Sequence, residues 1–279
     1  MDIIKASGEK EKFNKEKLYG SLKRAGAQSG LAEEICKEMA KAVHPGVSTE
    51  EILNQTLRCL KKENPILAAR YNLKRAIMEL GPTGFPFERY VAEILKEYGY
   101  TTQVGRMVRG YCVSHEIDVI AQKEEKHFMV ECKYHNSGGV KSDVKVTLHT
   151  YARFLDIKKQ WEKLPGHRNF FHQAWLVTNT KCTGQAIQYA KCAGLKIISW
   201  RYPKNESLEY LIENKGLYPI TLLPSLTRYA KEKLAQTEVI LTKSLLEYSV
   251  DDLVKLTGLQ PNIAEKLQKE AKELYAGSY

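Results

Sequence analysis

EIDVIA (residues 116–121) and FMVECK (residues 128–133) are two largely apolar segments near the middle of the chain, separated by a polar stretch. Their length and composition predict two β-strands joined as a hairpin. If the hairpin is symmetric about its centre, Asp118 lies directly opposite Glu131, with the two Cβ atoms about 5 Å apart. Lys133, two residues beyond Glu131, shares that face of the sheet because side chains alternate along a strand. The segments therefore predict two carboxylates and one amine on one surface.

Two directly opposed carboxylates repel each other, so a fold tolerates them only with a cation between them. Mg²⁺ or Mn²⁺ suits hard oxygen ligands at this spacing. The tripeptide Asp/Glu-x-Lys is weak evidence by itself because it occurs six times in the chain. Only at Glu131 does it follow an apolar segment and face an acidic residue. The alternative is a cross-strand ion pair between Asp118 and Lys133 on a solvated face.

The pattern around the hairpin predicts an α/β layer fold over residues 86–205. Gly81-Pro82-Thr83-Gly84-Phe85-Pro86 cannot continue a helix and marks a domain boundary. Beyond it, segments typical of helices alternate with segments typical of strands. The expected helices are 86–98, 142–164 and 183–193, and the further strands are 100–106, 173–178 and 195–200. The central domain is thus expected to be a mixed sheet flanked by helices.

The central domain resembles the PD-(D/E)xK nucleases, and within them the Mrr-like restriction endonucleases. The resemblance rests on the following residues: Phe87-Glu88, Gly99-Tyr100, residues 116–120, residues 130–134, Leu176-Val177-Thr178-Asn179-Thr180, Ala186 and Ala190. It covers about residues 86–202. It implies a restriction-endonuclease-like fold and hydrolysis of DNA phosphodiester bonds.

The resemblance also implies roles for individual residues. Asp118 and Glu131 would ligate Mg²⁺, with the backbone carbonyl of Cys132 as a further ligand, and Lys133 would orient or activate the attacking water. Glu88 matches an acidic position that many members turn toward the metal. The alternative for Glu88 is a solvated helix residue without a role in the site.

Charge along the chain supports a polyanionic partner. The chain of 279 residues has 43 Lys and Arg against 33 Asp and Glu, a net charge of +10, of which +8 falls in residues 86–205, +4 in residues 1–85 and −2 in residues 206–279. Five basic residues on or just before the long helix are candidates for contacts with DNA phosphates. They are Lys141, Lys145, Arg153, Lys158 and Lys159. A solvated basic face is the alternative for each.

Residues 1–85 predict a small, mostly helical domain with a β-hairpin at its front. Short extended segments at 2–5 and 10–13 flank the turn signal Ser7-Gly8, and Asn14 is placed to cap a helix reaching to about Gln28. Further helices are expected at 31–43, after a capping box at Ser48 to about Glu63, and from Pro65 to Leu80.

This domain resembles the ATP-cone, a nucleotide-binding regulatory module. The resemblance rests on the order of Ile3-Ile4-Lys5-Ala6-Ser7-Gly8, Glu11-Lys12-Phe13-Asn14 and Lys17-Leu18, with residues 47–53 and Leu67-Ala68-Ala69-Arg70-Tyr71 similar to the later helices. It implies a pocket for ATP or dATP. The implied pocket residues are Ile3, Lys5, Gly8, Glu11, Asn14, Lys17 and Thr49. The alternative is a helical domain with solvated lysines.

Residues 206–279 predict a helical tail. Leu245 to Leu274 resembles half of a helix-hairpin-helix pair, although the acidic balance favours a packing or dimerisation element. Homo-oligomerisation stays open. The absence of a signal-like N-terminus and of a long apolar run predicts an intracellular, cytoplasmic protein without a membrane partner.

The segments together predict a nucleotide-regulated, Mg²⁺-dependent DNA endonuclease. Two other functions fit the same residues. One is a non-catalytic DNA-binding regulator that senses ATP or dATP and keeps the nuclease fold as a scaffold. The other is a structure-selective repair or junction nuclease.

Overall fold

The computed structural model describes residues 1–163 and 171–276. These residues form two compact units, Met1–Ile77 with Tyr218–Tyr279, and Met78–Leu217. The last residue of the helix expected at 142–164 lies outside the described residues. Within the described ranges, no helix has both the length and the apolar character needed to cross a membrane.

The unit Met78–Leu217 is built on a mixed sheet, which confirms the predicted α/β architecture. In the described residues the strand order is β3-β4-β5-β7-β9, with β3, β4 and β5 antiparallel and β7 and β9 parallel to β5. The strands are β3 (Thr101–Arg109), β4 (Ser114–Lys123), β5 (Lys126–Lys133), β7 (Gln173–Thr178) and β9 (Lys196–Ile198). A short parallel pair, β6 (Lys141–Ser142) and β8 (Lys181–Cys182), lies outside this sheet.

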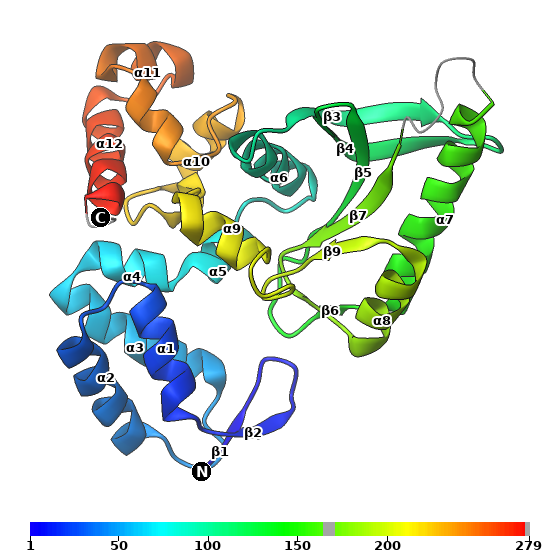
Figure 1. Ribbon diagram of the computed structural model, residues 1–279. Coiled ribbons are helices and arrows are strands. Elements are labelled where there is room, and N and C mark those ends of the chain that lie inside the picture. The colour runs from blue at the N-terminus through cyan, green and yellow to red at the C-terminus, as the bar shows by residue number, and fades with distance from the viewer. Residues whose placement is uncertain (164–170, 277–279) are drawn as a thin grey trace. The chain divides into compact units, whose positions relative to one another are not determined.

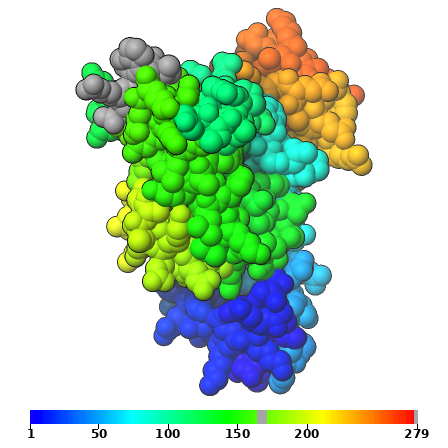
Figure 2. Space-filling model, turned by 90° about the vertical axis from the view of Figure 1, so that its right-hand side faces the viewer, coloured from blue at the N-terminus to red at the C-terminus, as the bar shows by residue number. Residues whose placement is uncertain are grey.

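Helices cover both faces of the sheet. Figure 1 shows α6 (Phe85–Glu97) on one side and α7 (Val144–Trp161) with α8 (Gly184–Ala193) on the other, and α9 (Leu208–Lys215) follows β9. The core beneath α7 joins Phe154 to Met129 and Leu176 of the sheet. The outer surface of this helical layer, green to yellow-green, faces the viewer in Figure 2.

The hairpin β4–β5 has the predicted register. Val119 pairs with Val130 and Ile120 with Met129, and Glu124 in the turn has a positive φ of 55°. Continued by one residue on each strand, the same register places Asp118 opposite Glu131. The periodicity of the sequence therefore sets the two carboxylates on neighbouring strands, as expected.

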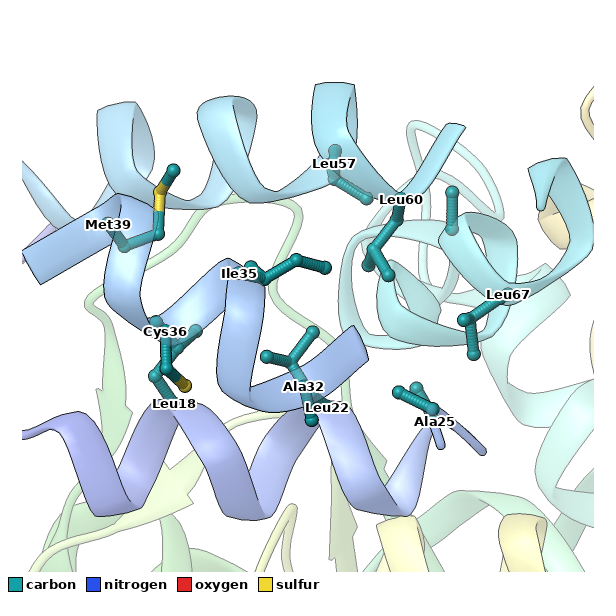
Figure 3. Packing of buried hydrophobic residues seen from close by; sticks show 12 residues of the cluster. Leu18, Leu22, Ala25, Ala32, Ile35, Cys36, Met39, Leu57, Leu60 and Leu67 are labelled. Carbon is teal, nitrogen blue, oxygen red and sulfur yellow. The ribbon is translucent and has the colours of Figure 1, made fainter. Parts of the chain in front are cut away.

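The N-terminal part of the other unit is a hairpin and a helical layer. The hairpin joins β1 (Asp2–Ile4) to β2 (Lys10–Lys12), and Gly8 in its turn has a φ of 82° that favours glycine. The helices are α1 (Lys15–Arg24), α2 (Ser29–Ala42), α3 (Thr49–Glu63), α4 (Pro65–Tyr71) and α5 (Leu73–Met78). Leu22, Ile35 and Leu60 pack in the core between them (Figure 3).

The predicted caps are confirmed, but two helix lengths were wrong. The side chains of Asn14 and Ser48 accept the Lys17 and Glu51 amide protons at 2.8 and 3.0 Å. The first helix ends at Arg24 instead of Gln28. The helix expected from Pro65 to Leu80 is two helices, because Asn72 has φ −87° and ψ 8°, outside the helical region.

The C-terminal residues pack within the same unit as this layer. They form η1 (Ile220–Leu222), α10 (Arg228–Ala235), η2 (Lys243–Glu247), α11 (Val250–Thr257) and α12 (Pro261–Tyr275). Arg70 donates to the Leu274 carbonyl, and the Thr221 hydroxyl donates to the Ala76 carbonyl at 2.6 Å. Residues 218–276 therefore group with the N-terminal layer, while α9 of the expected tail lies in the nuclease-like unit.

Candidate functional site

Asp118 and Glu131 lie beside each other on β4 and β5. The Asp118 carboxylate accepts the Cys132 amide proton at Oδ2, 2.7 Å away, which ties the two strands together just beyond their last ladder pair. This bond uses the amide of the residue whose carbonyl was expected to ligate a metal. The Cys132 side chain is buried, and burial raises the pKa of its thiol well above the ordinary value, so the sulfur is protonated.

Burial makes it energetically unfavourable for Asp118 and Glu131 to carry negative charges at the same time. Burial raises the pKa of Asp118. Burial, and then the Asp118 charge, raise the pKa of Glu131 to about 7. Two neighbouring carboxylates whose pKa values are raised by burial form a site that a cation stabilises.

The cation nearest Glu131 is Arg153, in the middle of α7. Its guanidinium donates from Nη1 to Glu131 Oε2 and from Nη2 to the Glu116 backbone carbonyl. The side chains of Arg153 and Glu131 are only 14% and 16% exposed. The sequence assigned Arg153 to DNA phosphates and missed this pairing, because the two residues meet only when α7 packs on the sheet.

Glu88 lies in the first turn of α6. It is the fourth acidic side chain of a group that also contains Asp118, Glu116 and Glu131. Burial raises its pKa to about 7, with smaller contributions from the charges of Asp118, Glu116 and Glu131. Glu88 is therefore electrostatically coupled to the two carboxylates, unlike a fully solvated helix residue. Glu116 was not singled out in the sequence, although it lies two residues before Asp118.

Lys133 is exposed at the end of β5, and the chain just beyond it is firmly held. The Asn179 side chain, 1% exposed, accepts the His135 amide proton at 2.9 Å and donates to the His135 carbonyl at 2.7 Å. Tyr134 donates its hydroxyl to the Gly81 carbonyl at 3.1 Å. The sequence resemblance included Asn179 without giving it a role, and the structure places it as the support for the segment after Lys133.

The donor set fits a hard divalent cation held by few protein ligands. Among residues 1–163 and 171–276, no three His, Cys, Asp or Glu side chains are arranged to hold a metal ion. The donors offered are the Asp118 and Glu131 carboxylates. Mg²⁺ commonly binds through one or two carboxylates and keeps several waters, so the chemistry of the pair suits it.

The basic residues expected to contact DNA do not share one helix face. At about 100° per residue, Lys145 and Lys159 lie about 40° apart around α7, whereas Lys158 lies about 140° from Lys145. The Lys158 amine is 3.8 Å from a Glu162 carboxylate oxygen, and the Lys159 amine is 4.0 Å from the centre of the Tyr111 ring. Lys141 is exposed on β6, just before the helix.

Lys5 and Lys17, two of the residues predicted to bind the nucleotide, form ion pairs with a third, Glu11. The Lys5 amine is 2.5 Å from Glu11 Oε2, and Lys17 pairs with the other carboxylate oxygen. These bonds, that from Lys17 first, lower the pKa of Glu11 to about 2. Asn14 uses its side-chain oxygen as the cap of α1.

Three further pocket candidates lie on the hairpin or close to it in the fold. Ile3 is buried on β1, and Gly8 forms the hairpin turn. Ile4 donates its amide proton to the Val47 carbonyl at 2.9 Å, which sets β1 beside the chain that leads into Thr49, the first residue of α3. The structure thus brings the end of β1 and the start of α3 together.

Comparisons with known proteins agree with this architecture. The family model for the ATP cone domain matches residues 1–78, that for a restriction endonuclease matches residues 82–201, and that for the AF1548-like C-terminal domain matches residues 218–275. The first two matches confirm the resemblances stated from the sequence. The third was not among them.

The chain is also similar to one known protein sequence and to one solved structure. An uncharacterized protein of Archaeoglobus fulgidus is 36% identical over 184 residues, which are 66% of this chain and 99% of that protein. The crystal structure of a protein of unknown function, AF1548, is similar with a TM-score of 0.60 and 35% identity, and the match covers 70% of this chain and 100% of that chain.

Proposed function

The chain belongs to the AF1548-like family and joins a restriction endonuclease domain to an ATP cone domain, and from this premise we propose that it is a nucleotide-regulated, divalent-metal-dependent DNA endonuclease. One observation supports the nuclease part most directly. Asp118 and Glu131 are adjacent, largely buried carboxylates on a hairpin whose register also sets Lys133 on their side of the sheet.

Each residue of the site would have a separate role in hydrolysis. Asp118 and Glu131 would hold Mg²⁺ or Mn²⁺, which when bound stabilises negative charge on a phosphodiester. Lys133 orients the attacking water with its amine, and the paired bonds between Asn179 and the His135 backbone keep the end of β5 in place. Glu88 adds negative charge near the two ligands and raises the affinity of the site for a cation. The Cys132 carbonyl remains a proposed additional ligand.

Basic residues around α7 would hold the DNA. We assign contacts with phosphates to Lys141, Lys145, Lys158 and Lys159, which bind the backbone without reading the sequence. Because Lys158 lies on a different side of α7 from Lys145 and Lys159, a duplex contacts only a subset of these residues at one time. The net charge of +8 in residues 86–205 supports the attraction of DNA to this unit.

The cone domain would bind an adenine nucleotide, ATP or dATP. Lys5 and Lys17 would bind the phosphates after their ion pairs with Glu11 have broken. The surrounding hairpin and helix starts contain Ile3, Gly8, Asn14 and Thr49. The start of a helix offers unpaired amides that favour phosphate groups. Nucleotide binding there would regulate cleavage.

A non-catalytic DNA-binding regulator is the second candidate function. The observation that favours it is the ion pair of Arg153 with Glu131, which already neutralises one of the two carboxylates. A protein that keeps the nuclease fold as a scaffold needs no metal at that position. The cleavage experiment separates the two functions.

The test is cleavage of supercoiled, linear, methylated and branched DNA by the full chain with Mg²⁺ or Mn²⁺, with and without ATP or dATP. We expect Asp118→Ala and Lys133→Ala to cut at least about a thousandfold more slowly than the wild type. Lys126→Ala is the matched control, because Lys126 is an exposed lysine at the other end of β5. Wild-type protein that binds DNA and cuts none of these substrates would favour the scaffold.

The nucleotide part has its own measurement. Titration calorimetry with ATP and with dATP should give saturable binding by the wild type, and Lys5→Ala or Lys17→Ala should weaken it about tenfold. Lys10→Ala, on the same hairpin and exposed, is the control. Equal affinity in all four proteins would contradict the assignment of the pocket.

A further inference from the structure

Arg153 occupies an unusual position for a basic residue of a nuclease-like surface. Its guanidinium is largely buried and makes two contacts that flank Asp118, one to the Glu131 carboxylate and one to the Glu116 carbonyl. A guanidinium held in this way cannot also contact a DNA phosphate. Its contacts are directed to the acidic residues of the chain itself.

Arg153 also stabilises the charged carboxylates more than Lys133 does. Its guanidinium donates directly to the Glu131 carboxylate, whereas Lys133 is the exposed last residue of β5. The guanidinium therefore supplies much of the positive charge that keeps this group of acidic residues folded together.

A divalent cation at the same carboxylates would meet the same need for positive charge. Glu131 Oε2 is engaged by Arg153, and a metal ligand must present lone pairs to the ion. Two cations within contact distance of one carboxylate also repel each other, and partial burial strengthens that repulsion. The ion pair of Glu131 with Arg153 therefore disfavours the binding of a divalent cation by the same carboxylate, and a bound cation disfavours the ion pair.

We propose that Arg153 competes with a divalent cation for the Glu131 carboxylate, so that the guanidinium holds the site in the metal-free protein and leaves Glu131 when a metal binds. This inference rests on the proposed function, since it assumes a metal at Asp118 and Glu131. It adds a residue outside the Asp, Glu-x-Lys motif to the control of the site. Released from Glu131, the guanidinium has the planar donor geometry that suits a substrate phosphate.

The test is the affinity of the full chain for Mn²⁺, measured by titration calorimetry and by electron paramagnetic resonance without DNA. Arg153→Met keeps much of the apolar stem and removes the competing charge, so we expect Mn²⁺ to bind at least about tenfold more tightly than to the wild type. Arg153→Lys keeps a charge but loses the two-fold donor geometry and should fall between them. Tryptophan fluorescence of each variant, recorded before titration, verifies that it is folded.

Two controls locate the effect. Lys191→Met removes one positive charge from the neighbouring helix α8 at an exposed position and should leave the Mn²⁺ affinity unchanged. Asp118→Asn should abolish binding both in the wild type and in the Arg153→Met background, which identifies the measured site.

The outcomes separate the inference from the function beneath it. Mn²⁺ that binds the wild type at Asp118 but binds Arg153→Met equally or more weakly would overturn the competition and leave the metal-dependent nuclease standing. No Mn²⁺ binding by either protein would overturn both. Binding by Arg153→Met alone would support the competition in its strongest form.

Discussion

Glu11 of the cone hairpin and Glu131 of the nuclease hairpin are both glutamates in ion pairs, yet their pKa values move in opposite directions. Glu11 is 27% exposed and pairs with two lysines, which lower its pKa to about 2. Glu131 is 16% exposed and pairs with Arg153, but burial and Asp118 raise its pKa to about 7. The presence of a cationic partner does not by itself decide the charge state of a carboxylate.

The difference follows from the solvent around each site. In the cone, water already stabilises every charge, so the lysines add to a favourable state and their pairing contributes little to folding. In the nuclease unit, the carboxylates have lost much of their water, and one guanidinium does not fully replace it. Both sites are neutralised by residues of the chain itself, but only the buried one depends on that neutralisation for stability.

The largest expected effect is the loss of stability in Arg153→Met. Removing the guanidinium leaves two largely buried carboxylates without their nearest cation, so we expect the free energy of unfolding to fall by about 2–3 kcal/mol at neutral pH without metal. Urea unfolding followed by tryptophan fluorescence measures it. Trp161, Trp175 and Trp200 all lie in the unit Met78–Leu217, and the chain has three tryptophans, so the signal reports that unit alone.

A control variant at Lys17 of the exposed cone site and a second substitution at Glu131 of the buried site test this prediction. Lys17→Met removes a cation from the exposed cone site and should leave the midpoint of thermal unfolding unchanged. Adding Glu131→Gln to Arg153→Met removes the unbalanced charge and should restore most of the loss. An Arg153→Met protein as stable as the wild type would show that solvent reaches the buried site, and the contrast between the two glutamates would fail.

The second effect concerns ligand affinity in the cone. Glu11 holds both lysines proposed to bind phosphate, so Glu11→Gln should raise the affinity for ATP about threefold to tenfold, measured by titration calorimetry. Glu9→Gln is the matched control, because Glu9 is an exposed glutamate of the same hairpin, 3.5 Å from the Lys5 amine. A weaker affinity in Glu11→Gln would mean that Glu11 contacts the nucleotide directly.

The elements that follow from local pattern were predictable from the sequence. Alternation of apolar residues predicts the register of β4 and β5, and the side chains of Asn14 and Ser48 predict the starts of α1 and α3. The break at Asn72 was missed because the apolar spacing continues across it, and only the backbone conformation interrupts the helix.

The parts of the site that depend on long-range packing were not predictable. Arg153 is 22 residues from Glu131, and nothing in its neighbourhood distinguishes it from the other basic residues of α7. The same holds for Arg70 and Leu274, whose contact draws the C-terminal helices into the unit of the cone. Motifs identify the acidic residues and Lys133, whereas their partners come from elements that meet only in the folded chain.

The smallest expected effect is the titration of Glu11 itself. Since the pKa of Glu11 lies below the ordinary value of 4.5, its ion pairs favour the folded hairpin above that pH, and the contribution is lost as the pH falls toward 2. Carboxyl chemical shifts measured by NMR should give a pKa of about 2 in the wild type, and a value close to 4.5 in the Lys5→Met/Lys17→Met double variant. Because the site is exposed, 0.5 M salt should also move the wild-type value upward. A wild-type Glu11 that titrates near 4.5 at low salt would show that water outcompetes both lysines, and the cone would then present its two cations to a nucleotide without any carboxylate to displace.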